Sequence, residues 1–139
     1  MPTETLWRKV LIVDDSDGLR GLYRLALELD GRFQVVGEAT DGAAAIDRAR
    51  DLQPTFVMLD VQMPVMDGLT ALPEILDAAP HSRVLLHSSE PFDDPQPEGS
   101  DRLVAMEKAV PTDEWVELMA TVSERRGPSR ADAPPAQLP

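Results

Sequence analysis

The most constraining feature of the sequence is the stretch of residues 56–68, which reads FVMLDVQMPVMDG. It begins with four apolar residues, and a short apolar run closed by a polar residue is typical of a strand buried on both faces of a parallel sheet. The run ends at Asp60, whose carboxylate is therefore predicted at the carboxyl end of a strand, where open α/β sheets bind ligands. Asp67 is predicted to cap a helix that begins at Gly68.

A second group of acids follows another apolar run near the start of the chain. Residues 10–13 read VLIV, and Asp14 and Asp15 come directly after them. If the two runs are neighbouring parallel strands, these acids meet Asp60 at one edge of the sheet. Two carboxylates about 4 Å apart repel by about 4 kcal/mol at an effective dielectric constant of about 20. A metal ion, a paired lysine or protonation of one acid relieves that repulsion, and Mg²⁺ is a hard divalent ion that favours oxygen ligands.

The rest of the chain alternates short apolar runs with amphipathic segments. This alternation predicts an α/β fold in which helices cover both faces of a doubly wound parallel sheet. Strands are predicted at residues 9–13, 33–37, 55–59, 83–87 and 103–106. Helices are predicted at residues 17–30, 43–52, 67–79 and 112–126. The predicted inner stripe of the first helix consists of Leu19, Leu22, Ala26 and Leu29.

Two stretches do not fit this alternation. Residues 90–100 (EPFDDPQPEGS) hold three prolines and little that can pack, so no helix is predicted there. Residues 127–139 are rich in Pro, Ala and Ser, and they are predicted to be a disordered tail. Pro73 falls inside the third predicted helix, where it removes one backbone hydrogen bond and is expected to bend the helix.

Composition narrows the classes of function. A chain of 139 residues with 42% hydrophobic residues is long enough for one domain with a buried core. Its formal net charge of -12 argues against direct binding of nucleic acid or of an anionic membrane surface, because both need clustered Lys and Arg. We find no cysteine, no signal-peptide pattern and no apolar run that could span a bilayer, so we expect a soluble cytoplasmic protein.

Together these residues resemble the receiver domain of bacterial two-component response regulators. The blocks VLIVDDS and LDVQMPVMDG carry the resemblance, with Ser88 after the fourth strand and Lys108 after the fifth, and it covers residues 9–126. It implies a flavodoxin-like sheet of five parallel strands in the order 2-1-3-4-5. The family's fourth helix is expected to be missing or distorted, because residues 90–100 stand in its place. Residues 127–139 are too few for an effector domain, so we expect a stand-alone receiver.

The resemblance also implies a role for each site residue. Asp60 is expected to accept a phosphoryl group, Asp15 to bind Mg²⁺ directly, and Asp14 to bind it largely through water. The backbone carbonyl of Gln62 is expected to be a further Mg²⁺ ligand, and Ser88 is expected to hydrogen-bond the phosphoryl group. Such groups neutralise the charge of a phosphoryl group during its transfer.

Two more residues and the partners follow from the same resemblance. Lys108 is expected to form an ion pair with the phosphoryl group, and Gln62 and Glu90 are expected to modulate how water attacks the acyl phosphate. The expected phosphoryl donor is a sensor histidine kinase or a histidine phosphotransferase. The output is expected to pass to a downstream protein effector, with no direct contact to nucleic acid and no insertion into a membrane.

Departures from the family keep other hypotheses open. Ala105 stands where the family often has an aromatic residue, and residues 90–100 replace a helix of its output face, so a phosphorylation-independent interaction module is the alternative. A phosphatase with an aspartyl nucleophile generally needs an acid at the position of Gln62, so the protein is expected not to be an enzyme. We interpret His81 as a surface residue and His87 as a sheet residue rather than as metal ligands, because nothing pairs with them at ligand spacing.

Overall fold

The structure is a computed structural model that describes residues 8–88, 103–107 and 111–126. Strands and helices alternate along these residues, as the apolar runs predict. The strands are β1 (Lys9–Val13), β2 (Gln34–Ala39), β3 (Phe56–Asp60), β4 (Arg83–Ser88) and β5 (Leu103–Glu107). The helices are α2 (Asp17–Asp30), α3 (Gly42–Leu52), α4 (Gly68–Ala78) and α5 (Thr112–Arg126).

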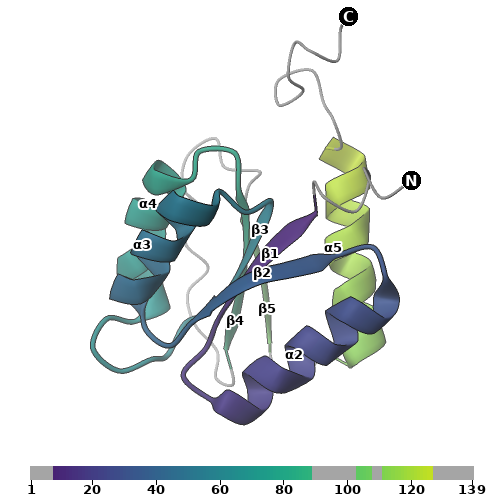
Figure 1. The fold of residues 1–139 in the computed structure, drawn as a ribbon, viewed down its shortest axis with the longest axis horizontal. Coiled ribbons are helices and arrows are strands. Elements are labelled where there is room, and N and C mark those ends of the chain that lie inside the picture. The colour runs from purple at the N-terminus through teal and green to yellow at the C-terminus, as the bar shows by residue number, and fades with distance from the viewer. Residues whose placement is uncertain (1–7, 89–102, 108–110, 127–139) are drawn as a thin grey trace, which may run out of the picture.

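The strands form one five-stranded sheet in the order β2-β1-β3-β4-β5, and each neighbouring pair runs parallel. This order confirms the predicted flavodoxin-like fold. Figure 1 shows α3 and α4 together on one face of the sheet, whereas α2 and α5 cover the other face. Because the strands are parallel, their carboxyl ends lie at one edge, and the winding of the sheet changes direction between β1 and β3.

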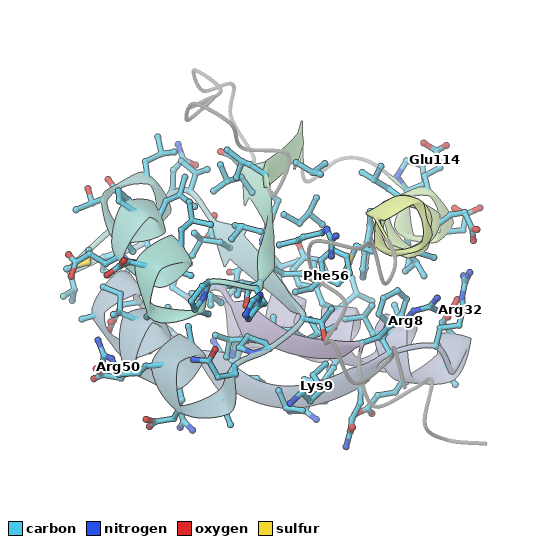
Figure 2. The ribbon with its side chains drawn as sticks, turned by 90° about the horizontal axis from the view of Figure 1, so that it is seen from above. Arg8, Lys9, Arg32, Arg50, Phe56 and Glu114 are labelled. Atoms are coloured by element: carbon cyan, nitrogen blue, oxygen red, sulfur yellow. The ribbon has the colours of Figure 1, made fainter. Side chains whose placement is uncertain are left out.

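Alternate residues of the central strand β3 enter two separate cores. Phe56 and Met58 pack with residues of α2 and α5, whereas Val57 and Leu59 pack with residues of α3 and α4. Fully burying a side chain of this size stabilises a fold by about 1.5–3 kcal/mol. Figure 2 shows Phe56 in the interior and Arg50 of α3 at the outer surface. The strand that carries Asp60 is therefore fixed from both faces.

Helix α2 buries only part of the predicted stripe, since Leu19 and Ala26 pack partly buried against the core and Leu22 and Leu29 do not. Its buried side chains are Tyr23 and Leu27, and Leu19 is partly buried against the same core. The prediction was wrong for Leu22 and Leu29, which are 49% and 77% exposed. Leu19 and Ala26 share helical spacing with Tyr23 as well as with Leu22, and the ring of Tyr23 packs edge-on against other rings inside the fold.

The end of α2 is tied to α5 by Arg32. Its Nε lies 2.7 Å from Oδ1 of Asp30, and its Nη2 lies 3.0 Å from Oε1 of Glu117. Figure 2 shows Arg32 beside α5. The hydrogen bonds that Arg32 donates hold the pKa of Asp30 below its usual value. These contacts join the two helices that cover one face of the sheet.

Several predictions concern residues outside the described ranges. These are the distorted helix at residues 90–100, the disordered tail at residues 127–139, and the roles of Glu90 and Lys108. Helix α4 continues past Pro73, whose side chain is exposed. No helix in the described ranges is long and apolar enough to cross a membrane.

Candidate functional site

Three buried polar side chains lie together where β1, β3 and β4 end, namely Asp14, Asp60 and His87. The register of the sheet explains this meeting, since Val13 pairs with Leu59 and Asp60 pairs with His87. Each of the three side chains offers one ligand atom, and these atoms all lie within 4.8 Å of one another. The two acids thus meet at one edge of the sheet, as the sequence predicts.

Backbone amides of the following loops orient both carboxylates. Oδ1 of Asp14 accepts a hydrogen bond of 2.9 Å from the N–H of Ser16. Oδ1 of Asp60 accepts one of 3.1 Å from the N–H of Gln62. Each bond joins an aspartate to the residue two positions later, which is the geometry of an Asx turn. The same local device therefore fixes both acids at the ends of their strands.

The other predicted site residues lie around these acids. Asp15 follows Asp14 and is exposed, so it lies outside the buried group. Ser88 is buried at the end of β4, and its Oγ donates a hydrogen bond of 3.3 Å to Oε1 of Gln62. The structure therefore places Gln62 and Ser88 in contact, while Lys108 is outside the described residues and its predicted role is untested.

Arg20 of α2 ties the Asp14 loop to β2. Its Nη1 donates a hydrogen bond of 2.7 Å to the backbone carbonyl of Asp14, and its Nε donates one of 2.9 Å to Oε1 of Glu38. Arg24 donates to the other oxygen of Glu38 at 2.8 Å. Burial alone would raise the pKa of Glu38, but the hydrogen bonds from Arg24 and Arg20 outweigh it and hold that pKa below its usual value. Glu38 is therefore an anchor for the loop.

The loop after β3 folds back onto the strand. The N–H of Gly68 donates a hydrogen bond of 2.9 Å to the carbonyl of Val61. A Cβ at Gly68 would lie 2.1 Å from the carbonyl oxygen of Asp60, so only glycine permits this approach. Asp67 caps α4 as predicted, because its Oδ1 accepts a hydrogen bond of 2.8 Å from the N–H of Thr70. The start of α4 is thereby held against the carboxyl end of β3, which carries Asp60.

Aromatic rings pack beneath the acidic group. The ring of Tyr23 lies edge-on to the imidazole of His87 with a centroid distance of 5.3 Å, and edge-on to Trp115 at 5.4 Å. Burial raises the pKa of the Tyr23 phenol, and the negative charges of Asp14 and Asp60 raise it further. The pattern of the sequence places His87 in a strand, which the structure confirms. The sequence pattern does not indicate that the imidazole meets two acids, because that meeting depends on the register of β3 and β4.

The acidic group fits a divalent cation by its donor atoms. Asp14 and Asp60 present carboxylate oxygens within ligand range of each other, whereas Asp15, the next residue after Asp14, is exposed and lies outside this group. Oxygen ligands of this kind suit hard ions such as Mg²⁺. A cation between the carboxylates also removes a repulsion of about 4 kcal/mol at about 4 Å and an effective dielectric constant of about 20. The carboxylates of Asp14 and Asp60 therefore fit Mg²⁺ by the chemistry of their donor atoms.

Comparison with known proteins gives the family. A family model described as the response regulator receiver domain matches residues 10–96. Among solved structures, the response regulator domain of Thermotoga maritima CheB superposes with a TM-score of 0.65 at 26% identity, covering 84% of this chain and 93% of that one. The REC domain of AraT, a response regulator from Geobacillus stearothermophilus, gives a TM-score of 0.70 at 27% identity, covering 86% of this chain and 95% of that one.

The curated relatives that match are longer proteins. The chain is 41% identical over 81 residues to a protein-glutamate methylesterase/protein-glutamine glutaminase of Maricaulis maris, which is 58% of this chain and 20% of that protein. It is 46% identical over 81 residues to the second such protein of Pseudomonas fluorescens, which is 58% of this chain and 21% of that protein. The chain therefore spans about a fifth of the length of these relatives.

These relatives correct one prediction. The expectation that the protein is not an enzyme is wrong, because the relatives that share its receiver segment are named as methylesterases and glutaminases, which are enzymes. That expectation depended on Gln62, which speaks against an aspartyl phosphatase and says nothing about a methylesterase or a glutaminase. The sheet, the paired strand-end acids and the family match lead to one conclusion. The chain belongs to the receiver domain family of two-component response regulators and is similar to the receiver of CheB.

Proposed function

We propose that Asp60 accepts a phosphoryl group from a phosphohistidine of a partner protein, so that the chain acts as a phosphorylation-dependent signalling receiver. The observation that carries this proposal is the place of Asp60 at the end of β3, with its carboxylate in ligand range of Asp14. The family match over residues 10–96 supports it. The site residues would act through charge neutralisation and positioning, which is most of what phosphoryl transfer requires.

The proposed reaction is a displacement at phosphorus. A carboxylate oxygen of Asp60 attacks the phosphorus atom, the P–N bond to the donor imidazole breaks, and its electron pair returns to the ring, which takes up a proton. The product is an acyl phosphate on Asp60. When bound by Asp14, Asp15 and the carbonyl of Gln62, Mg²⁺ would supply positive charge next to the transferring group.

Three further residues complete the proposed site. Ser88 would exchange its hydrogen bond to Gln62, the residue two positions after Asp60, for one to a phosphoryl oxygen. Lys108, the residue directly after β5, would form an ion pair with the phosphoryl group. Gln62 and Glu90 would govern how fast water reaches the acyl phosphate.

The proposed partners follow from the chemistry and from the relatives. The donor would be a sensor histidine kinase or a histidine phosphotransferase in the cytoplasm, and the receiver would comprise residues 9–126 with a tail at residues 127–139. The output would pass to a protein effector. Since the matching relatives are protein-glutamate methylesterases/protein-glutamine glutaminases, an effector of that class is the first to test.

Intact-mass spectrometry tests this function. The full chain is incubated with Mg²⁺ and phosphoramidate, a small donor with a P–N bond. We expect the mass of one phosphoryl group to be added in the wild type and in Asp47→Asn, whose carboxylate is exposed on α3, but not in Asp60→Asn. If the wild type gains no mass, and partner binding is the same in Asp60→Asn, the phosphorylation-independent interaction module is the better function.

A further inference from the structure

His87 is a buried imidazole inside an otherwise acidic group. It pairs in register with Asp60, so both side chains leave the sheet on the same face. That face is covered by α2 and α5, because Met58 and Leu85, two residues earlier on the same strands, belong to the core that includes Tyr23 and Trp115. The side chains of His87, Asp14 and Asp60 are each at most 1% exposed.

The imidazole is packed against an aromatic ring of α2. Tyr23 meets it edge-on, with ring centroids 5.3 Å apart and planes at 79°, and Trp115 in turn supports Tyr23. Rings packed in this way restrict the rotamers of their neighbours. The position of the His87 nitrogens relative to Asp14 and Asp60 is therefore set by the fold before any ion binds. A ligand that is already positioned loses little entropy on binding.

The spacing of the ligand atoms suits one small ion. Metal–ligand bonds of about 2.0–2.2 Å place neighbouring ligand atoms about 3 Å apart and opposite ones about 4 Å apart. The ligand atoms of Asp14, Asp60 and His87 lie within 4.8 Å of one another, so shifts of less than about 1 Å bring all of them onto one ion. The burial of the group leaves few positions for the water molecules that Mg²⁺ usually retains.

We propose that His87 is an inner ligand of the metal site together with Asp14 and Asp60, and that its nitrogen makes the site favour imidazole-binding divalent ions such as Zn²⁺ or Co²⁺ over Mg²⁺. This proposal deepens the metal site of the proposed function and relies on that site. Imidazole nitrogen suits Zn²⁺ and the later transition ions, whereas Mg²⁺ is bound by oxygen. Mg²⁺ still binds through the carboxylates, and the histidine sets how strongly other ions compete with it.

Calorimetric titration of the full chain with Zn²⁺ alone and with Mg²⁺ alone tests the proposal. In His87→Leu, the affinity for Zn²⁺ falls at least about tenfold, while the affinity for Mg²⁺ changes far less. The matched control is His81→Leu, which removes the other histidine of the chain, an exposed residue, and leaves both affinities unchanged. The same ratio of Zn²⁺ to Mg²⁺ affinity in the wild type and in His87→Leu would overturn the proposal.

A second measurement uses the unaltered protein and so does not depend on how a variant folds. In ¹⁵N spectra of the imidazole groups, one equivalent of Zn²⁺ shifts a ring nitrogen of His87 and leaves His81 in place. If Zn²⁺ binds and the His87 nitrogens do not shift, His87 is no ligand. Neither measurement contains a phosphoryl donor. If Asp60 is phosphorylated but His87 neither shifts nor changes the Zn²⁺ affinity, only this inference is contradicted. If His87 does both but Asp60 is not phosphorylated, only the proposed function is contradicted.

Discussion

The guanidinium of Arg20 lies 2.7 Å from the backbone carbonyl of Asp14, so a helix side chain holds the strand end that carries a site acid. Arg20 also donates hydrogen bonds to Asp17 and Glu38. Its side chain is only 12% exposed, and its bonds to Asp14 and Glu38 are partly buried, whereas the bond to Asp17 is exposed. The loop between β1 and α2 is therefore tied to both its own helix and β2.

Removing the hydrogen bonds of Arg20 should destabilise the fold. We expect Arg20→Met to lower the free energy of unfolding by about 1.5–3 kcal/mol, because the partly buried hydrogen bonds from a charged group to Glu38 and to the Asp14 carbonyl are lost. Arg20→Lys should recover only part of the loss, since an ammonium group cannot reproduce the planar fork. Urea unfolding measures both. The control is Arg50→Met, an exposed arginine of α3, and equal losses at the two positions would contradict the prediction.

Gly68 should tolerate no side chain. In Gly68→Ala the new Cβ would meet the carbonyl oxygen of Asp60 at 2.1 Å, so the loop or the strand must move. We expect a loss of about 2 kcal/mol or more in the free energy of unfolding, as for other strained backbone sites. Gly21→Ala is the matched control, because a Cβ at Gly21 of α2 meets nothing within 4 Å and alanine should stabilise the helix by about 0.5–1 kcal/mol. Thermal unfolding of both variants decides, and a stabilised Gly68→Ala would contradict the close approach.

The fold could be predicted from the sequence where local pattern and sheet packing agree. Short apolar runs followed by acids predicted strands β1 and β3, and their alternation with helices predicted the parallel sheet. The meeting of Asp14 and Asp60 followed because parallel strands end at the same edge. These features depend on the periodicity of apolar residues and on the order of strands and helices, and both are visible in the sequence.

The rest depends on packing between distant segments, which one sequence does not contain. Leu22 and Leu29 have the helical spacing of a buried stripe, yet they lie at its exposed margin, and Tyr23 and Leu27 are buried instead. His87 joins the acids only through the register of β4 on β3. Nothing in the sequence indicates that Val65, a β-branched residue, has a φ of 69°.

Val65 stores backbone strain that a substitution should relieve. Its φ of 69° lies in the left-handed region, which costs a β-branched residue about 1–2 kcal/mol, and its side chain is 87% exposed, so little packing opposes a change. We expect Val65→Gly to raise the free energy of unfolding by up to about 1 kcal/mol, after the greater flexibility of glycine in the unfolded chain is counted. Val65→Ile keeps the branching and should give no gain. Chemical denaturation of the pair would contradict the prediction if both variants matched the wild type.

Glu38 should make part of the stability depend on pH at the acid end. Its hydrogen bonds from Arg24 and Arg20 outweigh the effect of burial and hold its pKa in the folded protein below the usual value of 4.5. A carboxyl whose pKa is lowered by folding stabilises the protein fully above its unfolded pKa. That contribution is lost as the pH falls through the lower, folded pKa, because the folded carboxyl then takes up its proton.

We therefore expect Glu38→Gln to be less stable than the wild type at pH 6–7, and expect this difference to shrink as the pH falls below about 4.5. Unfolding by urea at a series of pH values measures the difference. Glu74→Gln removes an exposed carboxylate of α4 and corrects for the general effect of one negative charge fewer. A difference between wild type and Glu38→Gln that stays constant down to strongly acid pH would show that the arginines do not lower the pKa of Glu38, and that the residue anchors the Asp14 loop without relying on its charge.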